Sequence, residues 1–268
     1  MKTNKNRKKP IWVIKIGSAI FVDGGPILLK SLMQQVAELK QKYQVDIIWV
    51  TSGAIASARS RTHKQWKKLP EKQALSAIGQ PMLMDSYNLA LNATGLMGAQ
   101  VLLTYDDMAR PKHRQNLKNT LATLLQWKVV PILNENDAVA TDEIQFGDND
   151  LLSAKVACLM GADRLIILTN VDGLYDSPPN KNPKAKLIPE LPKVTKALLA
   201  AMDSSAVSSV GRGGMYSKLR AAAQAQSKSI PTWILRGDLP HNLLKVAAQE
   251  KIGTYVGPQR KILLSKKK

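Results

Sequence analysis

The chain has 268 residues, 44% of them hydrophobic and 5% aromatic, and its formal net charge at pH 7 is +19. This length can bury a full core, in one large α/β domain or two modest ones. The single cysteine excludes an internal disulfide, and no apolar run approaches the roughly 18 residues of a membrane-spanning helix. We therefore expect a soluble, cytoplasmic protein with no membrane partner.

Much of the positive charge lies at the two ends. The first ten residues and the last ten each contain five basic residues and no acid. We interpret 1–10 and 258–268 as basic tails that flank a folded domain at 11–257. A basic surface can bind nucleic acid, but the sequence has no RNP, KH or zinc-finger pattern. Solvated charge is the favoured interpretation, so no specific nucleic acid is expected as a partner.

Short apolar runs alternate with helical patterns along the chain. Strands are expected at 11–16, 45–50, 100–104, 129–133, 165–169, 232–235 and 253–256, with another short one at 186–188. Helices are expected at 26–43, 71–92 (interrupted at 79–81), 113–127, 195–202 and 214–228, and helix-prone runs follow 51–54 and 147–148. This alternation predicts an α/β protein, a three-layer αβα sandwich with a mainly parallel central sheet. Two lobes, approximately 11–160 and 161–257, would share that sheet.

The stretch between Lys128 and Lys155 contains six carboxylates and no Lys or Arg. Three asparagines are interleaved with the acids: Asn134, Asn136 and Asn149. These polar residues follow an apolar strand, and open α/β sheets bind ligands just past the carboxyl ends of their strands. A capped helix start after Gly147 is the purely structural alternative. Because a cap does not account for the amides, we predict a site for a small zwitterion.

Three further segments place small or cationic residues at strand ends or helix starts. They are 15–18 (KIGS), 52–54 (SGA) and the glycine-rich 211–218 (GRGGMYSK). Taken singly, they are typical of a surface lysine, a helix cap and an ordinary αβ turn. Together with the acidic stretch they supply the cations and N–H donors that phosphoryl transfer needs. P-loop, HRD/DFG, G-x-S-x-G and His/Cys metal patterns are missing, which disfavours the corresponding enzyme classes.

These motifs, in this order and spacing, resemble the glutamate 5-kinases of the amino acid kinase superfamily. The matching segments are 15–18, 50–55, 134–139, 146–154, 168–169, 171–175 and 213–215 with Lys218. The resemblance implies the amino acid kinase fold and ATP-dependent phosphorylation of the γ-carboxylate of L-glutamate, the first step of proline synthesis. It also implies Mg²⁺ with ATP, a homo-oligomer (dimer or tetramer) and L-proline as a feedback inhibitor. Many members add a C-terminal PUA domain, and the sequence ends too early for one, so we expect the catalytic domain alone.

The resemblance also assigns roles to individual residues. Lys15 and Lys218 would flank the phosphoryl group, and Asp150 would hold the two lysines in place. The glutamate-binding residues would be Ser52, Gly53, Asn134, Asp137, Asp148 and Asn149. The nucleotide-binding residues would be Lys15, Gly17, Thr169, Asn170, Gly211, Arg212, Gly213, Gly214, Met215, Tyr216, Ser217 and Lys218. No residue is expected to be a metal ligand, and no general base is needed because a carboxylate acceptor is already ionised at neutral pH.

Three positions on the nucleotide side depart from the family pattern. Asn170 stands where Asp is usual, Arg212 where a small residue such as Thr is usual, and Tyr216 where Ser is common. Arg212 would either clamp the phosphates or be a surface cation, and the second is favoured because the two lysines already supply the charge. Within the superfamily, N-acetylglutamate, aspartate or UMP is the alternative acceptor. Glutamate is favoured because a free α-amino group calls for the carboxylates of the acidic stretch.

Overall fold

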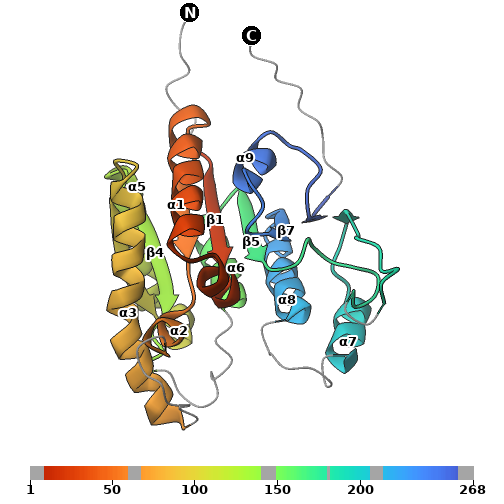
Figure 1. Cartoon of the computed structure of the whole chain (residues 1–268), viewed down its shortest axis with the longest axis horizontal. Helices are drawn as coiled ribbons and strands as arrows, with labels where there is room; N and C mark the ends of the chain where they lie inside the picture. The colour runs from red at the N-terminus through yellow and green to blue at the C-terminus, as the bar shows by residue number, and fades with distance from the viewer. Residues whose placement is uncertain (1–8, 60–67, 140–148, 180–181, 206–213, 259–268) are drawn as a thin grey trace, which may run out of the picture.

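An eight-stranded sheet runs through the residues that this computed structural model describes, which are 9–59, 68–139, 149–179, 182–205 and 214–258 (Figure 1). The strands are β1 (Ile11–Ile16), β2 (Asp46–Val50), β3 (Gly98–Leu103), β4 (Val130–Glu135), β5 (Arg164–Thr169), β6 (Glu190–Leu191), β7 (Thr232–Arg236) and β8 (Thr254–Val256). Their order in the sheet is β3-β4-β2-β1-β5-β7-β8-β6. Among the described pairs, only β7 and β8 are antiparallel. The prediction of a mainly parallel sheet is therefore confirmed.

Helices cover both faces of the sheet (Figure 1). They are α1 (Ser18–Lys42), α2 (Ala54–Arg59), α3 (Leu69–Asn92), α4 (Tyr105–Ala109), α5 (Pro111–Gln126), α6 (Asn149–Met160), α7 (Lys196–Ser205), α8 (Met215–Gln226) and α9 (Asn242–Ala247). Side chains alternate along a strand, so Val13 packs in the core under α5, α6 and α8, and Ile14 in the core under α1, α3 and α9. These two cores and the sheet between them make the three-layer αβα sandwich that the sequence predicts.

Two expectations about single elements are wrong. The predicted strand at 186–188 is not a strand, because only Leu187 forms an isolated bridge, to Tyr175. The strand of this excursion is β6, which lies between Pro189 and Pro192 and pairs with β8. The expected interruption of the long helix at 79–81 is also absent, since α3 continues through Pro81.

Gly79 has a packing role in α3. A Cβ at this position would overlap the Ala54 carbonyl and lie 2.9 Å from the backbone nitrogen of Ala58, both in α2. The glycine therefore lets α2 lie directly against α3. Because α2 follows Ser52 and Gly53, this close contact also fixes where that turn sits.

We expect Gly79→Ala to lower the free energy of unfolding by about 1–3 kcal/mol, as overpacking does in a well-packed interior. The better helix propensity of alanine would offset less than about 1 kcal/mol of this loss. Urea unfolding measures the change, and Asp85→Ala, at an exposed position of the same helix, should stay within about 0.5 kcal/mol of the wild type. A Gly79→Ala protein as stable as the wild type would contradict the close α2–α3 contact.

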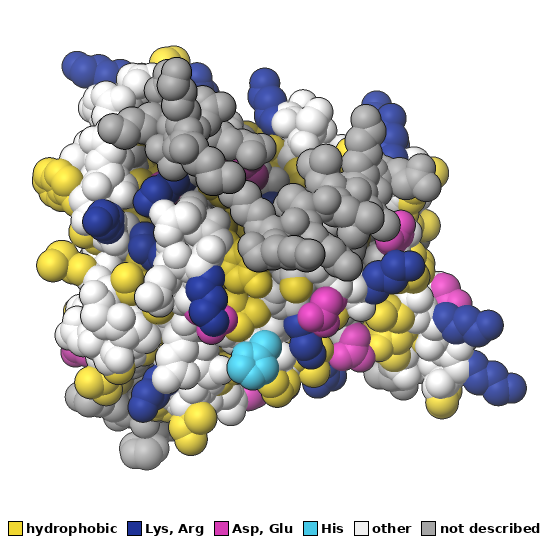
Figure 2. All heavy atoms as spheres, turned by 90° about the horizontal axis from the view of Figure 1, so that it is seen from above, with side chains coloured by type: hydrophobic (Ala, Val, Ile, Leu, Met, Phe, Trp, Pro, Cys, Tyr) yellow, Lys and Arg dark blue, Asp and Glu magenta, His cyan; other side chains and the backbone are white. Residues whose placement is uncertain are grey.

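On one face of the molecule, the basic side chains are dispersed. On the face in Figure 2, the Lys and Arg side chains of the described residues stand apart from one another rather than in one continuous patch. The proposed basic tails fall almost entirely outside the described residues. None of the helices in the described segments is long and apolar enough to cross a membrane.

Candidate active site

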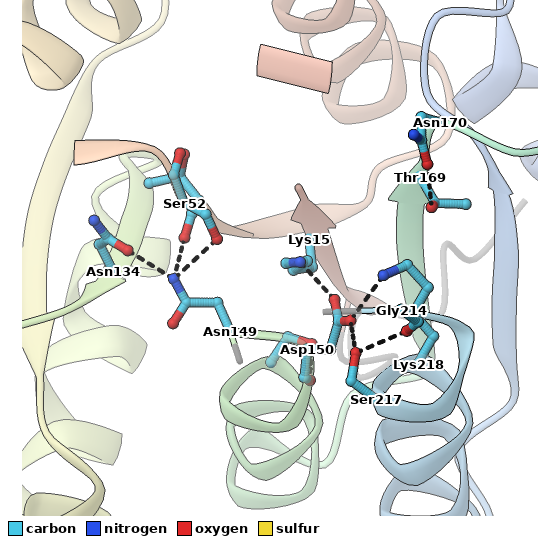
Figure 3. A network of polar contacts seen from close by, with 12 residues as sticks. Lys15, Ser52, Asn134, Asn149, Asp150, Thr169, Asn170, Gly214, Ser217 and Lys218 are labelled. Carbon is cyan, nitrogen blue, oxygen red and sulfur yellow. Dashed lines mark hydrogen bonds and ion pairs between the residues drawn. The ribbon is translucent and has the colours of Figure 1, made fainter. Parts of the chain in front are cut away.

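The carboxyl ends of the central parallel strands bring predicted site residues from the described part of the chain to one edge of the sheet (Figure 3). β1 leads to Gly17, β2 to Ser52 and Gly53, β4 carries Asn134, and β5 ends at Thr169. Two helices begin at the same edge, α6 at Asn149 and α8 at Met215. Helix N-termini and strand ends thus converge where an anionic ligand can be bound.

Asp150 is held between the two predicted catalytic lysines. Its Oδ1 lies 2.6 Å from Lys15 Nζ, and its Oδ2 lies 3.1 Å from Lys218 Nζ and 2.7 Å from Ser217 Oγ. Asp150 is fully buried and each lysine is only 6% exposed. Lys15 points to the face that α6 and α8 cover, because the neighbouring Ile14 and Ile16 pack on the opposite one. The structure therefore joins β1, α6 and α8 at a single carboxylate.

The charge state of Asp150 depends on its two cations. Burial alone would raise the pKa of this carboxyl group, but the ammonium groups of Lys15 and Lys218 and the Ser217 hydroxyl lower it from 3.8 to about 2. The carboxylate is therefore ionised at neutral pH. Two cations and one anion leave one net positive charge beside the strand ends.

A second cluster is made of side-chain amides. Asn149 Nδ2 donates to Thr51 O (2.6 Å), Asn134 Oδ1 (2.7 Å) and Ser52 Oγ (3.1 Å) (Figure 3). Asn134 Nδ2 in turn donates to Gln80 Oε1 of α3 at 2.8 Å. These bonds fix the orientation of the Asn149 amide. Its Oδ1 is buried and has no hydrogen-bond partner among the described residues, so it can accept a bond from a ligand.

Asp137 follows β4, is half-buried, and accepts a hydrogen bond from Ser76 Oγ of α3 at 3.3 Å. Burial raises the pKa of Asp137, and the Ser76 bond partly opposes that effect. A pocket of about 280 Å³ adjoins these residues between α3 and the ends of β3 and β4. It is lined by Ser76, Ala77, Gln80, Pro81, Gln100, Leu102, Glu135, Asn136 and Ala138.

The predicted nucleotide side lies apart from the amide cluster. In Figure 3, Ser52, Asn134 and Asn149 are on one side of Asp150, and Thr169 and Asn170 are on the other. Thr169 is buried at the end of β5, and Asn170 is exposed.

The remaining nucleotide-side residues are at the starts of two helices. Gly17 is the N-cap of α1, and Gly214 is the N-cap of α8. Met215 and Tyr216 are half-buried in the first turn of α8. The ring of Tyr216 lies 5.8 Å from the Arg220 guanidinium. Four predicted site residues, Asp148, Gly211, Arg212 and Gly213, are outside the described residues.

Several residues that support this site were missed by the sequence analysis. They are Thr51, Ser76, Gln80, Tyr87 and Gln100. Four of them lie in α3 or β3, which provide none of the predicted site residues. The segment 79–81 could have indicated Gln80, since a glutamine in the middle of an apolar helical stripe is a buried polar group in need of partners.

The parallel sheet, the buried carboxylate between two lysines and the helix N-termini at one edge define an α/β phosphotransferase. The family model described as "Amino acid kinase family" matches residues 10–236. The chain belongs to the amino acid kinase family.

Known proteins that are similar in sequence to this chain are named glutamate 5-kinase. The glutamate 5-kinase of Geobacter sulfurreducens is 43% identical over an alignment of 261 positions, which covers 95% of this chain and 69% of the relative. That of Hydrogenovibrio crunogenus is 40% identical over an alignment of 271 positions, which covers 98% of this chain and 71% of the relative.

Solved structures of lower identity share the fold. The isopentenyl phosphate kinase of T. acidophilum superposes with a TM-score of 0.61 at 16% identity, covering 92% of this chain and 99% of that one. The UMP kinase of Ureaplasma parvum gives a TM-score of 0.61 at 18% identity, covering 94% of this chain and all (100%) of the other. The expected amino acid kinase fold is thereby confirmed.

Proposed function

We propose that the chain is an ATP-dependent kinase that phosphorylates the γ-carboxylate of L-glutamate to L-glutamyl 5-phosphate, the first step of proline biosynthesis. The observation that carries this proposal is the buried ion triad Lys15–Asp150–Lys218 beside an amide cluster with an unpaired buried acceptor. Relatives at 40–43% identity named glutamate 5-kinase support the same reaction. The cytoplasm, a homo-oligomer and inhibition by L-proline stay predictions of the family resemblance.

The two lysines are proposed to stabilise the transferring phosphoryl group. Asp150 contacts both ammonium groups and so holds them in place. Because one carboxylate pairs with two ammonium groups, one net positive charge remains. Preorganised cations in a buried site stabilise a transition state more strongly than mobile ones in water. The attacking oxygen belongs to a carboxylate that is ionised at neutral pH, so catalysis requires positioning and charge neutralisation rather than a base.

The amide cluster is proposed to bind glutamate. A free α-ammonium group needs acceptors, and Asp137 and the Oδ1 atom of Asn149 supply them. Ser52 Oγ and the Gly53 N–H can donate to a carboxylate of the same ligand. An ammonium beside Asp137 would favour the charged form of this carboxyl group, opposing the effect of burial. Asp148 completes the proposed set from outside the described residues.

ATP is proposed to lie on the opposite side of Asp150, against Gly17, Thr169, Asn170 and the segment 211–218. Within the described residues, no group of three or more His, Cys, Asp or Glu side chains could hold a metal ion. The carboxylate oxygens of Asp150 are already bonded to Lys15, Lys218 and Ser217. We propose that Mg²⁺ binds mainly to the ATP phosphates and to water, as it usually does at kinase sites, and that it neutralises phosphate charge there.

We expect Asp137→Ala to raise the KM for glutamate at least tenfold and to leave the KM for ATP unchanged. The reason is that a bound ammonium would lose its carboxylate partner in a half-buried site. Steady-state kinetics with each substrate varied in turn measures both constants. Asp106→Ala removes an exposed carboxylate of α4 and should change neither. An equal loss of ATP affinity in Asp137→Ala would instead assign the acidic stretch to the metal–nucleotide.

The choice of acceptor is tested by an ADP-release assay with the whole chain and four acceptors: glutamate, N-acetylglutamate, aspartate and UMP. Turnover with glutamate alone is the expected result. Turnover with one of the others in its place would identify a different amino acid kinase. No turnover, together with RNA binding that weakens steeply with salt, would favour the nucleic-acid alternative.

A further inference from the structure

Three buried side chains form a hydrogen-bonded series that ends on the backbone of the Ser52–Gly53 turn. Trp49 Nε1 donates to the Tyr87 hydroxyl at 2.9 Å, and this hydroxyl lies 2.7 Å from Thr51 Oγ1. Thr51 Oγ1 donates to the Ser52 carbonyl oxygen at 3.2 Å. Trp49, Thr51 and Tyr87 are each 0% exposed. The series thus connects α3 to the turn without contact with solvent.

The direction of these bonds follows from the number of protons that each group has. An indole N–H can only donate, so the Tyr87 oxygen accepts from Trp49 and keeps its own proton for Thr51. Thr51 then has its single proton for the Ser52 carbonyl. Burial raises the pKa of the Tyr87 hydroxyl well above its ordinary value, so this group remains a donor across the working pH range.

Fixing the Ser52 carbonyl also fixes the Gly53 N–H. The peptide bonds of the described residues are all trans, and in a trans peptide the C=O and N–H groups point in opposite directions. A carbonyl held toward Thr51 therefore turns the Gly53 N–H away from that side chain. Gly53 has a φ of +112°, which L side chains rarely adopt, so the turn depends on glycine and on external bonds for its conformation.

The ring of Tyr87 contributes a second contact with the same edge of the sheet. It stacks on Phe21 of α1, with centroids 5.9 Å apart and an interplanar angle of 22°. The Phe21 N–H donates to the Gly17 carbonyl at 3.2 Å, and a Cβ on Gly53 would lie 3.5 Å from the Phe21 ring. The Tyr87 ring therefore packs on a residue that contacts both of the glycine turns proposed to face the substrates.

We propose that Tyr87 is a positioning residue, which acts through Thr51 to orient the Ser52–Gly53 peptide so that the Gly53 N–H faces the bound glutamate. The inference rests on the proposed function, since glutamate is taken as the ligand. A tyrosine that only fills the core would need its ring and not its hydroxyl. The hydroxyl is the part that reaches the turn, and removing it alone separates the two roles.

Tyr87→Phe is the test, because it keeps the ring contacts with Phe21 and Trp49 and removes one oxygen. We expect the KM for glutamate to rise about tenfold, as when a hydrogen-bonding group of a buried network is lost, while kcat and the KM for ATP stay within about twofold. In ¹⁵N-labelled protein, the Gly53 amide resonance should shift and its hydrogen exchange should accelerate.

Tyr255→Phe is the matched control. Tyr255 is also buried, packs edge-on against a tryptophan (Trp233, 4.8 Å between centroids) and donates its hydroxyl to a backbone carbonyl (Pro258, 2.9 Å). It lies in β8, two strands from β5 in the sheet. This variant should lose a comparable amount of thermal stability and keep the wild-type KM for glutamate.

The inference is overturned if Tyr87→Phe has the same KM for glutamate as Tyr255→Phe. It is also overturned if the KM for glutamate and the KM for ATP rise together in Tyr87→Phe. Thr51→Val removes the next hydroxyl of the series and should reproduce the effect, with no further increase in the double variant. Thr51→Val also provides the test if Tyr87→Phe does not fold. Failure of the proposed function would be visible in the wild type, as no glutamate phosphorylation, and the Gly53 amide would still decide the role of Tyr87.

Discussion

Lys15→Ala and Lys218→Ala are each expected to lower kcat by about a hundredfold or more, equivalent to about 3 kcal/mol of lost transition-state stabilisation. Each lysine is buried and its ammonium lies within 3.1 Å of Asp150, so neither can be replaced by a mobile surface cation. Rapid-quench or steady-state kinetics at saturating glutamate and ATP measures the loss. Lys118→Ala, at an exposed position of α5, should retain wild-type turnover.

The lysine variants should fold, because the remaining lysine still pairs with Asp150. Circular dichroism and a cooperative unfolding transition check this point. Wild-type turnover in either folded variant would remove that lysine from the proposed site. A loss confined to the KM for ATP, with kcat intact, would make the residue a nucleotide-binding group only.

Asp150→Asn is expected to cost about 3–5 kcal/mol of stability at neutral pH, because it leaves two buried ammonium groups without their carboxylate. Turnover should fall together with stability, since the lysines lose the group that places them. Denaturant unfolding at pH 7 measures the loss. Asp85→Asn, at an exposed position of α3, is the control and should be close to the wild type. A variant as stable as the wild type would contradict the ion triad.

The pH dependence of this loss has a defined sign. The pKa of Asp150 is lowered from 3.8 to about 2 in the folded chain, because Lys15 and Lys218 outweigh the opposing effect of burial. Its contribution to stability is therefore complete above the unfolded value and is lost as the pH falls through the folded value. The stability difference between wild type and Asp150→Asn should be constant from pH 7 to about 5 and should shrink as the pH falls toward 2. A difference that grows on acidification would contradict the depressed pKa.

The architecture could be predicted because local pattern and tertiary burial agree. The run Ile11–Ile16 is buried at all six positions, as a continuous apolar strand of a parallel sheet must be. The helix break expected at 79–81 shows where this approach fails. Gly and Pro at 79 and 81 are weak helix formers, but contact with α2 selects glycine at that point and the packed helix tolerates the proline.

The site could be predicted only in part. Lys15, Asp150 and Lys218 stand in local motifs at strand ends and helix starts, and the family resemblance rests on these motifs. The hydrogen bonds that hold Ser52 and Asn149 in place depend on pairs of side chains that are distant in the sequence. Thr51 and Tyr87 are 36 residues apart, and Asn134 and Gln80 are 54 apart. Local periodicity of hydrophobic residues does not predict such pairs, because they depend on how α3 packs on the sheet.

The most direct measurement follows oxygen from the acceptor carboxylate. The whole chain is incubated with ATP and L-glutamate labelled with ¹⁸O in the γ-carboxylate, and hydroxylamine is added to trap an acyl phosphate. Hydroxylamine attacks the acyl carbon, so the C–O bond breaks and phosphate leaves with the bridging oxygen. If the carboxylate is the phosphoryl acceptor, the released phosphate contains one ¹⁸O and the hydroxamate forms in equal amount. Phosphate without ¹⁸O, with ADP released and no hydroxamate formed, would contradict phosphoryl transfer to glutamate.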